Sequence, residues 1–315
     1  MKKVVLFAFM LISGYSSIAQ ENILNAKSVE ELEEMRAEEM ANSDDTPLPY
    51  GYLAERDILW RRTVWENIDL DERVNFPLYY PVDTVRIDKS RRSLYDVLTK
   101  AARTGEISLF GDSYFNEKVA VEDIDKFLET EQLSPRGTDI LNENGIYDLD
   151  AKPSELAEKY NLEDFEQYVT VTTISSADVM SYHTRGIWYF DTKQSELRYR
   201  MIAIAPVTPD VNIKAGIITD DGNSPGVELF WVYLPEARNI LHKAKAFNGR
   251  NSARPISFDH ILNSRRFSAT IYQVDNVQGD RSVDRYIADN AMMQLLEADR
   301  LKEEIRNFEL DMWNY

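Results

Sequence analysis

Cysteine is absent from the 315 residues, and glycine and histidine are scarce, with 12 and 3 copies. Without cysteine the fold uses no disulfide framework, contains no thiolate metal site and offers no thiol for a lipid anchor. No run of about 18 apolar residues follows the N-terminal segment, so the sequence predicts no membrane-spanning helix in the remainder of the chain.

Basic residues are also in deficit, because 36 Lys and Arg face 54 Asp and Glu and leave a net charge of −18. A surface of this sign repels phosphates, which argues against nucleic acid and against anionic lipid as partners. The charge is compatible with a basic protein partner, and equally with a role in solubility alone.

The first 19 residues have the pattern of a secretory signal peptide. Two lysines precede the apolar run from Val4 to Ile12, which is too short to span a bilayer. Ser17-Ile18-Ala19 supplies the small residues that a signal peptidase reads, so Gln20 is the predicted mature start. The sequence therefore predicts a soluble protein that acts outside the cytoplasm.

The N-terminal half is predicted to be mainly helical. Residues 20–50 form an acidic, flexible arm, in which Ser28 and Glu31 make a capping-box pattern. Residues 55–76 are predicted to be a helix that ends at Pro77. A second helix follows Ser93 and ends before Gly105. Residues 130–167 are predicted to be loops, with one short helix that begins at Pro153.

The second half changes to extended patterns. Residues 186–191 and 197–205 form a predicted hairpin, in which Leu197, Tyr199, Met201 and Ala203 share one face. Strands are also expected at 168–174, 227–234 and 267–274, with helices after Pro235 and near 258–262. From Val283 one helical pattern, with Leu295 on its apolar side, continues to the end over about 45 Å.

The predicted fold class is therefore α+β. It consists of an antiparallel sheet in the C-terminal half with packed helices, a helical N-terminal part and a long C-terminal helix. The expected division is a signal peptide at 1–19, an arm at 20–50, an α+β domain at 51–280 and the C-terminal helix at 281–315.

The sequence contains one short motif typical of hydrolases. GNSPG at residues 222–226 fits the G-x-S-x-G pattern, with Ser224 as the nucleophile. That motif needs a strand before the serine and a helix after it, whereas here a turn precedes it and a strand follows. Pro225 also removes the amide that an oxyanion hole would use. We therefore favour a loop, and an exported serine hydrolase is kept as an alternative.

The other candidate chemistry is equally sparse. Glu66 and Asp69 are three residues apart and would share a helix face, which is the basis of a carboxylate-hydrolase alternative, although glycosidase carboxylates come from separate elements. We interpret them as a solvated face beside Trp65. No histidine pair has metal-ligand spacing, so no metal, cofactor or catalytic residue is predicted. A soluble periplasmic ligand-binding protein that uses Trp188 and Trp231 is the third reading, although both rings are expected to be core.

Four blocks, in order along the chain, carry a resemblance to a known family. They are DILWRRTVWENIDLDERVNFPLYYP (57–81), RRSLYDVLTKAARTGEI (91–107), RGIWYFDTKQSELRYRMIAIAPV (185–207) and LFWVYLPEARNILHKAKAFNGRNSARPISFDHILNSRRFSATIYQ (229–273). These blocks resemble the gliding-motility protein GldN, called PorN in non-gliding relatives. The likeness covers most of residues 55–287.

The resemblance implies a non-enzymatic structural subunit of the type IX secretion machinery in the periplasm. It implies rings formed with copies of itself and with an outer-membrane lipoprotein, GldK or PorK, and a meeting with the periplasmic part of the motor protein GldM or PorM. The family supplies no catalytic residues to carry over. From the sequence we expect Phe308, Met312 and Trp313 to contact a partner, because little chain follows to cover the C-terminal helix.

Overall fold

The computed structural model describes residues 28–31, 33–34, 46–83, 91–144, 146, 152–160, 165–219, 226–249, 251, 254–288 and 290–313. The chain divides into two units, 1–46 and 47–315. The predicted signal peptide and Ser224 lie outside the described residues. In the first unit the backbone amide of Glu31 donates to the Ser28 hydroxyl at 3.1 Å, which confirms the Ser28 side of the predicted cap.

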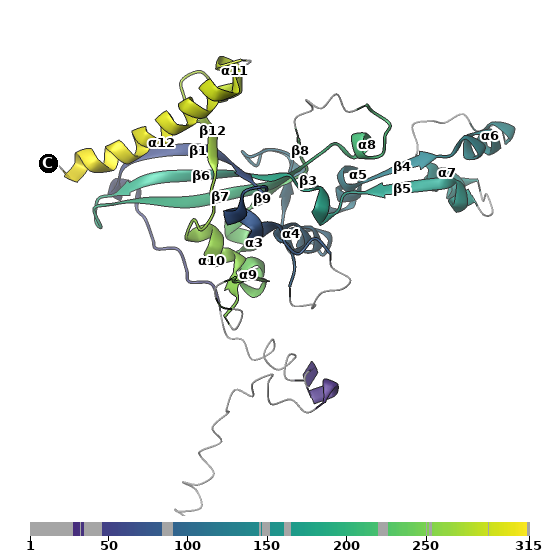
Figure 1. Cartoon of the computed structure of the whole chain (residues 1–315), viewed down its shortest axis with the longest axis horizontal. Coiled ribbons are helices and arrows are strands. Elements are labelled where there is room, and N and C mark those ends of the chain that lie inside the picture. Colours follow the sequence, from purple (N-terminus) through teal and green to yellow (C-terminus); the bar gives the residue numbers. More distant parts are fainter. Residues whose placement is uncertain are drawn as a thin grey trace, which may run out of the picture. The chain divides into compact units, whose positions relative to one another are not determined.

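An antiparallel sheet of eight strands is the frame of the second unit (Figure 1). Its strand order is β12-β1-β6-β7-β9-β2-β3, and β8 also pairs with β7. The strands are β1 (Ile58–Asp69), β2 (Leu109–Phe110), β3 (Lys118–Val119), β6 (Ser181–Asp191), β7 (Glu196–Thr208), β8 (Val227–Glu228), β9 (Trp231–Tyr233) and β12 (Thr270–Val274). A separate two-stranded ladder joins β10 (Lys245–Ala246) to β11 (Ile256–Ser257).

The predicted helix over residues 55–76 is wrong, because Ile58–Asp69 forms the strand β1. It is flanked by the 3-10 turns η2 (Glu55–Asp57) and η3 (Arg73–Asn75) and by the short helix α3 (Phe76–Tyr79). β1 lies between β6 and β12, so both of its edges are paired. Aromatic and β-branched residues in this stretch favour a strand once partners exist on both sides. The predicted helical N-terminal part therefore supplies an interior strand of the sheet.

The hairpin of β6 and β7 is confirmed, and it contains an irregularity that the sequence pattern does not reveal. Arg185 pairs with Ala203, but Gly186 pairs with Met201, so Ile202 is an extra residue in β7. A β-bulge of this kind reverses the alternation of faces. Met201 accordingly packs with Ile204 in the main core, whereas Ala203 joins a different cluster. The prediction that Leu197, Tyr199, Met201 and Ala203 share one face is therefore correct only as far as Met201.

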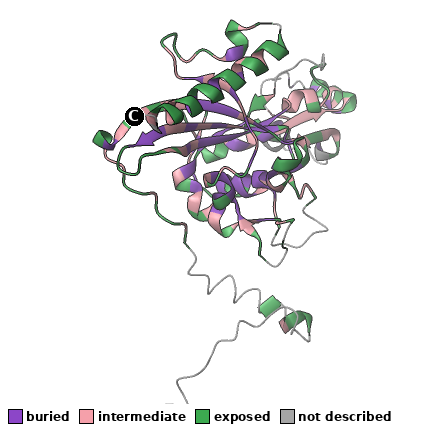
Figure 2. Ribbon diagram, turned by 60° about the vertical axis from the view of Figure 1, so that its left-hand side comes forward, coloured by how far each residue is buried: buried purple, intermediate pink, exposed green. Residues whose placement is uncertain are grey.

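The main core lies between the sheet and the helices α4 (Leu94–Arg103), α9 (Leu234–Lys243) and α10 (Phe258–Asn263). Ser93 caps α4 by accepting from the Asp96 amide at 3.2 Å, and Gly105 has a φ of 71°, which confirms both predicted ends. Figure 2 shows buried residues concentrated along the strands and on these helices. Shorter helices complete this part: η4 (Val121–Asp123), α5 (Ile124–Leu128), η6 (Ser176–Asp178) and α8 (Val211–Lys214).

Residues 129–173 contain more regular structure than the predicted loops. β4 (Glu129–Leu133) pairs antiparallel with β5 (Val169–Thr173), and α6 (Pro135–Glu143), α7 (Pro153–Lys159) and η5 (Phe165–Tyr168) accompany them. The predicted strand at 168–174 and the helix from Pro153 are thus confirmed. We call this set the β4–β5 module. β4 reads ETEQL, and such polar residues give no apolar alternation from which to predict a strand.

The C-terminal helical pattern is broken into α11 (Val283–Tyr286) and α12 (Ala291–Trp313). Asn290 causes the restart, because its side-chain oxygen accepts from the Met293 amide at 3.0 Å, as an N-cap residue does. The long helix therefore begins eight residues later than predicted and spans about 35 Å. Among the described residues, no helix combines the length and the apolar character needed to cross a membrane.

Candidate functional site

Glu66, which we predicted on a solvated helix face, is a buried residue of β1 with an exposed fraction of 1%. The Arg265 guanidinium donates to both carboxylate oxygens at 2.8 Å, and the Tyr199 hydroxyl donates at 3.0 Å. Asp69 is exposed and lies on the opposite face of β1, because residues three apart on a strand point to opposite sides of the sheet. The structure therefore does not bring these two carboxylates together.

The surroundings of Glu66 are built to hold its charge. A side chain on Gly186 would overlap the Tyr199 ring, so the glycine makes room for that ring to reach the carboxylate. Burial and the nearby Glu66 charge raise the pKa of Tyr199 well above its usual value, so its hydroxyl stays a donor. Burial is the largest single influence and acts to lower the pKa of Arg265, but the hydrogen bonds and the charge of Glu66, together with Tyr199, outweigh it and raise that pKa. These three bonds tie the Glu66 carboxylate of β1 to Tyr199 of β7 and to Arg265, which follows α10.

His183 makes the closest imidazole–carboxylate contact in the described structure, with 2.6 Å between its Nδ1 and an oxygen of Glu228. The other oxygen of Glu228 accepts from the indole of Trp231 at 2.8 Å, and the His183 ring lies 4.7 Å from the ring of Tyr272. Burial is the largest single influence and acts to raise the pKa of Glu228, but the interactions with His183 and the hydrogen bond from Trp231 together outweigh it, and the net pKa is lowered. The pair ties β6 to β8 across the sheet.

Trp188 and Trp231, the aromatic residues of the ligand-binding reading, do not converge. Trp231 is 1% exposed and packs with Trp65, Ala203 and Ala205. Trp188 is half-buried and packs in another cluster, with its ring centre 5.1 Å from that of Tyr199. A site that grips one ligand between these two rings is therefore not formed.

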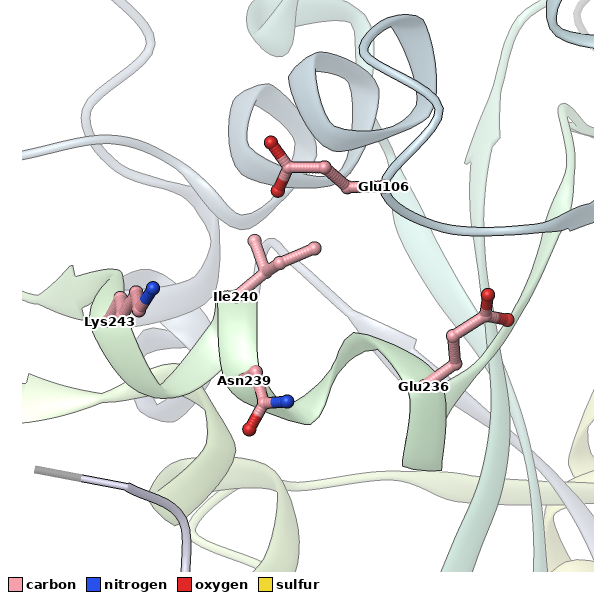
Figure 3. Close-up of a pocket in the computed structure, with 5 residues that line it drawn as sticks. All are labelled: Glu106, Glu236, Asn239, Ile240 and Lys243. Carbon is pink, nitrogen blue, oxygen red and sulfur yellow. The ribbon is translucent and has the colours of Figure 1, made fainter.

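In the described part of the chain, two surface depressions are each lined by charged and polar side chains around one apolar residue. One lies between the end of α4 and α9 and is lined by Glu106, Glu236, Asn239, Ile240 and Lys243 (Figure 3). Its two carboxylates point away from each other, and Glu236 accepts from the Ser108 hydroxyl at 3.2 Å. Within the described ranges, no group of three or more His, Cys, Asp or Glu is placed to hold a metal ion.

The helix α12 presents the clearest candidate surface for a partner. Its inner side packs on the sheet through Ala298, Leu301 and Ile305, which are buried. The exposed fractions near its start are 67% for Met292, 49% for Met293, 49% for Leu295 and 54% for Leu296. We call these four the α12 apolar turn. Leu295 is on the predicted apolar side of the helix but is exposed. The apolar turn was missed, although MMQLL in the sequence places four large apolar residues within five positions.

The far end of α12 is packed more closely than the partner prediction implies. The Phe308 ring stacks on Trp60 with 4.6 Å between ring centres and lies 6.0 Å from Phe190. Met312 is half-buried, and the side chain of Trp313 lies outside the described residues. Part of the Phe308 surface is thus covered within the chain, and its predicted contact with a partner stays a prediction.

The sheet, the helices on it and the apolar turn define the class: an α+β protein whose candidate surface lies on an outer helix. The family model described as "Gliding motility associated protein GldN" matches residues 53–314. The chain therefore belongs to the GldN family, which confirms the resemblance seen in its sequence blocks. The matched region also includes α12, which the blocks did not cover. The comparison with curated proteins gave no match.

Proposed function

We propose that this protein is a non-enzymatic structural subunit of the periplasmic ring of the type IX secretion and gliding machinery. In this proposal it assembles with copies of itself and with an outer-membrane lipoprotein of the GldK or PorK kind. It also meets the periplasmic part of a GldM- or PorM-type motor protein. Membership of a gliding-motility family supports the setting, and the expected export by a signal peptide supports the compartment.

The observation that carries the proposal is the α12 apolar turn. Four large apolar side chains in five residues are each about half exposed or more, on a helix whose other side is anchored to the sheet. Contiguous exposed apolar surface of this kind marks protein–protein contact sites in soluble proteins. Methionine side chains adapt their shape, which suits a surface that meets more than one partner.

The supporting argument against an enzyme comes from the groups that would do chemistry. Glu66 is held by Arg265 and Tyr199, and Glu228 is held by His183 and Trp231. Both carboxylates are therefore bonded to partners inside the fold. Ser224 lies outside the described residues, so the hydrolase alternative rests on its sequence pattern alone, and that pattern lacks the required strand–serine–helix order.

Co-expression with the lipoprotein of the same system tests the proposal. The wild-type chain is expected to elute with the lipoprotein as a large complex on size exclusion. Leu296→Glu should remove that complex or shift it to small species, because it places a charge in the centre of the buried contact. Ile217→Glu is the matched control, since Ile217 is also 54% exposed but lies after α8.

Separate elution of the two wild-type proteins would contradict the proposal. Equal loss of the complex in Leu296→Glu and Ile217→Glu would remove the apolar turn as its basis. A Met312→Ala variant tests the expected contact at the far end of α12 in the same assay.

A further inference from the structure

The extended segment that precedes β1 is fastened to the helices α9 and α10 through Tyr50. The guanidinium carbons of Arg238 and Arg200 lie 4.1 Å and 4.6 Å from the centre of the Tyr50 ring. The Tyr50 hydroxyl donates to the side-chain oxygen of Asn263 at 2.8 Å. One aromatic side chain is therefore recognised by both its ring and its hydroxyl. Figure 1 shows this segment, in purple, descending from β1 past α10 and α9.

The same two arginines also bind the backbone of the segment. Arg238 donates to the carbonyl oxygen of Leu48 at 2.7 Å, and Arg200 donates to that of Gly51 at 3.2 Å. Each guanidinium thus contacts the tyrosine ring and one carbonyl beside it. Contacts to carbonyls on both sides of the tyrosine fix the position of the segment along its length.

Two of the three binding groups, Arg238 and Asn263, are held in place by contacts that do not involve the segment. Arg238 and Asp259 have side chains only 11% and 8% exposed, and they pair through two hydrogen bonds of 2.8 and 3.2 Å. Asn263 donates to the Asp259 carboxylate at 2.7 Å, which turns its oxygen toward Tyr50. Because these groups are pre-ordered, they do not need to be immobilised when a segment binds.

The segment itself is also pre-ordered. It reads Pro47-Leu48-Pro49-Tyr50, and proline fixes φ at its own position and favours an extended conformation in the residue before it. Its other side chains make little contact, since Leu48 is 83% and Tyr52 is 91% exposed. Recognition therefore rests on Tyr50 and two carbonyls, and the prolines lower the entropy cost of holding the segment extended.

We propose that Arg200, Arg238 and Asn263 form a peptide-binding site for extended, proline-containing segments that carry a tyrosine. In this chain the site is occupied by its own residues 47–51. The inference does not depend on ring assembly, and it is tested on the isolated full chain. It predicts that removing the Tyr50 side chain vacates the site and that a peptide of the same sequence fills it again.

A labelled peptide of residues 46–53, TPLPYGYL, is titrated against the full chain and its Tyr50→Ala variant by fluorescence anisotropy. The variant is expected to bind the peptide saturably, and the wild type at least about tenfold more weakly, because its own segment competes at high effective concentration. The same peptide with alanine at position 50 retains Tyr52 and should bind at least about tenfold more weakly. Phenylalanine at position 50 should cost about fivefold, since one hydrogen bond is lost.

Equal binding by the two chains, or no binding by a Tyr50→Ala chain with an unchanged unfolding transition, would overturn the proposal. A second measurement covers the case in which Tyr50→Ala does not fold. Arg200→Ala leaves Tyr50 in the chain, and chymotrypsin should then cut after Tyr50 or Tyr52 at least about tenfold faster than in the wild type. Arg198→Ala is the control on the same strand, because Arg198 pairs with Glu196 and not with the segment. Equal cleavage in wild type and Arg200→Ala would also overturn the proposal.

Discussion

The large sheet and the β4–β5 module differ in what stabilises them, although both are antiparallel. The sheet is packed against a core that includes residues from β1, β7 and β9 and from the helices α3, α4, α5, α9 and α10. The module has a small core of its own, with Leu141, Ile146, Leu156 and Phe165 as its buried residues. In the sheet each buried side chain is one of many that form the core. In the module each buried side chain is a large fraction of the apolar core. Local stability should therefore differ between them.

The largest effect is expected in the sheet's core. Phe258→Ala removes a fully buried ring from the main cluster and should lower the free energy of unfolding by about 3–5 kcal/mol. Because this core joins the sheet to its helices, the loss should appear in the global transition. Urea unfolding followed by far-UV circular dichroism measures it. A change below about 1 kcal/mol would mean that the body is not one cooperative unit.

The next largest effect is expected at the buried ion pair in the sheet. Glu66→Gln leaves Arg265 without its charged partner, which should cost about 3 kcal/mol in the same measurement. The lower end of the usual range applies because the Arg265 side chain is 25% exposed and keeps some access to water. Glu196→Gln breaks an exposed pair with Arg198 and should cost less than about 0.5 kcal/mol. Equal costs for the two variants would contradict this role of burial.

The module should respond to a similar change in a different way. Phe165→Ala removes a ring that is 2% exposed, but the loss should be confined to residues 129–173. Hydrogen exchange of the β4 and β5 amides is expected to become about 100-fold faster, while the main urea transition moves by less than about 0.5 kcal/mol. If Phe165→Ala and Phe258→Ala lower the main transition equally, the two regions unfold together and the comparison fails.

The smallest effect is the pH dependence that comes from Glu228. Its pKa in the folded protein is below the ordinary 4.5, so the carboxylate stabilises the fold above that value. This contribution is lost as the pH falls through the lowered pKa. Since the side chain is 36% exposed, screening keeps it below about 1 kcal/mol. The stability difference between wild type and Glu228→Gln should therefore shrink in urea titrations as the pH falls below 4.5 and through the lowered pKa. A constant difference would contradict the lowered pKa.

Local signals in the sequence determined the elements whose ends or turns are encoded by a few residues. Ser93 and Gly105 bound α4, the hairpin of β6 and β7 has its turn where expected, and the α+β class is confirmed. The four sequence blocks were likewise enough to identify the family.

The tertiary structure decided what local patterns leave open. β1 is a strand because it gains hydrogen-bonding partners on both edges, and Glu66 is buried because Arg265, 199 residues later, neutralises it. The bulge at Ile202 depends on pairing with β6, and the site for Tyr50 makes hydrogen bonds between residues 149, 190 and 213 positions apart. Such long-range pairings carry no local periodicity, so only the folded chain brings them together.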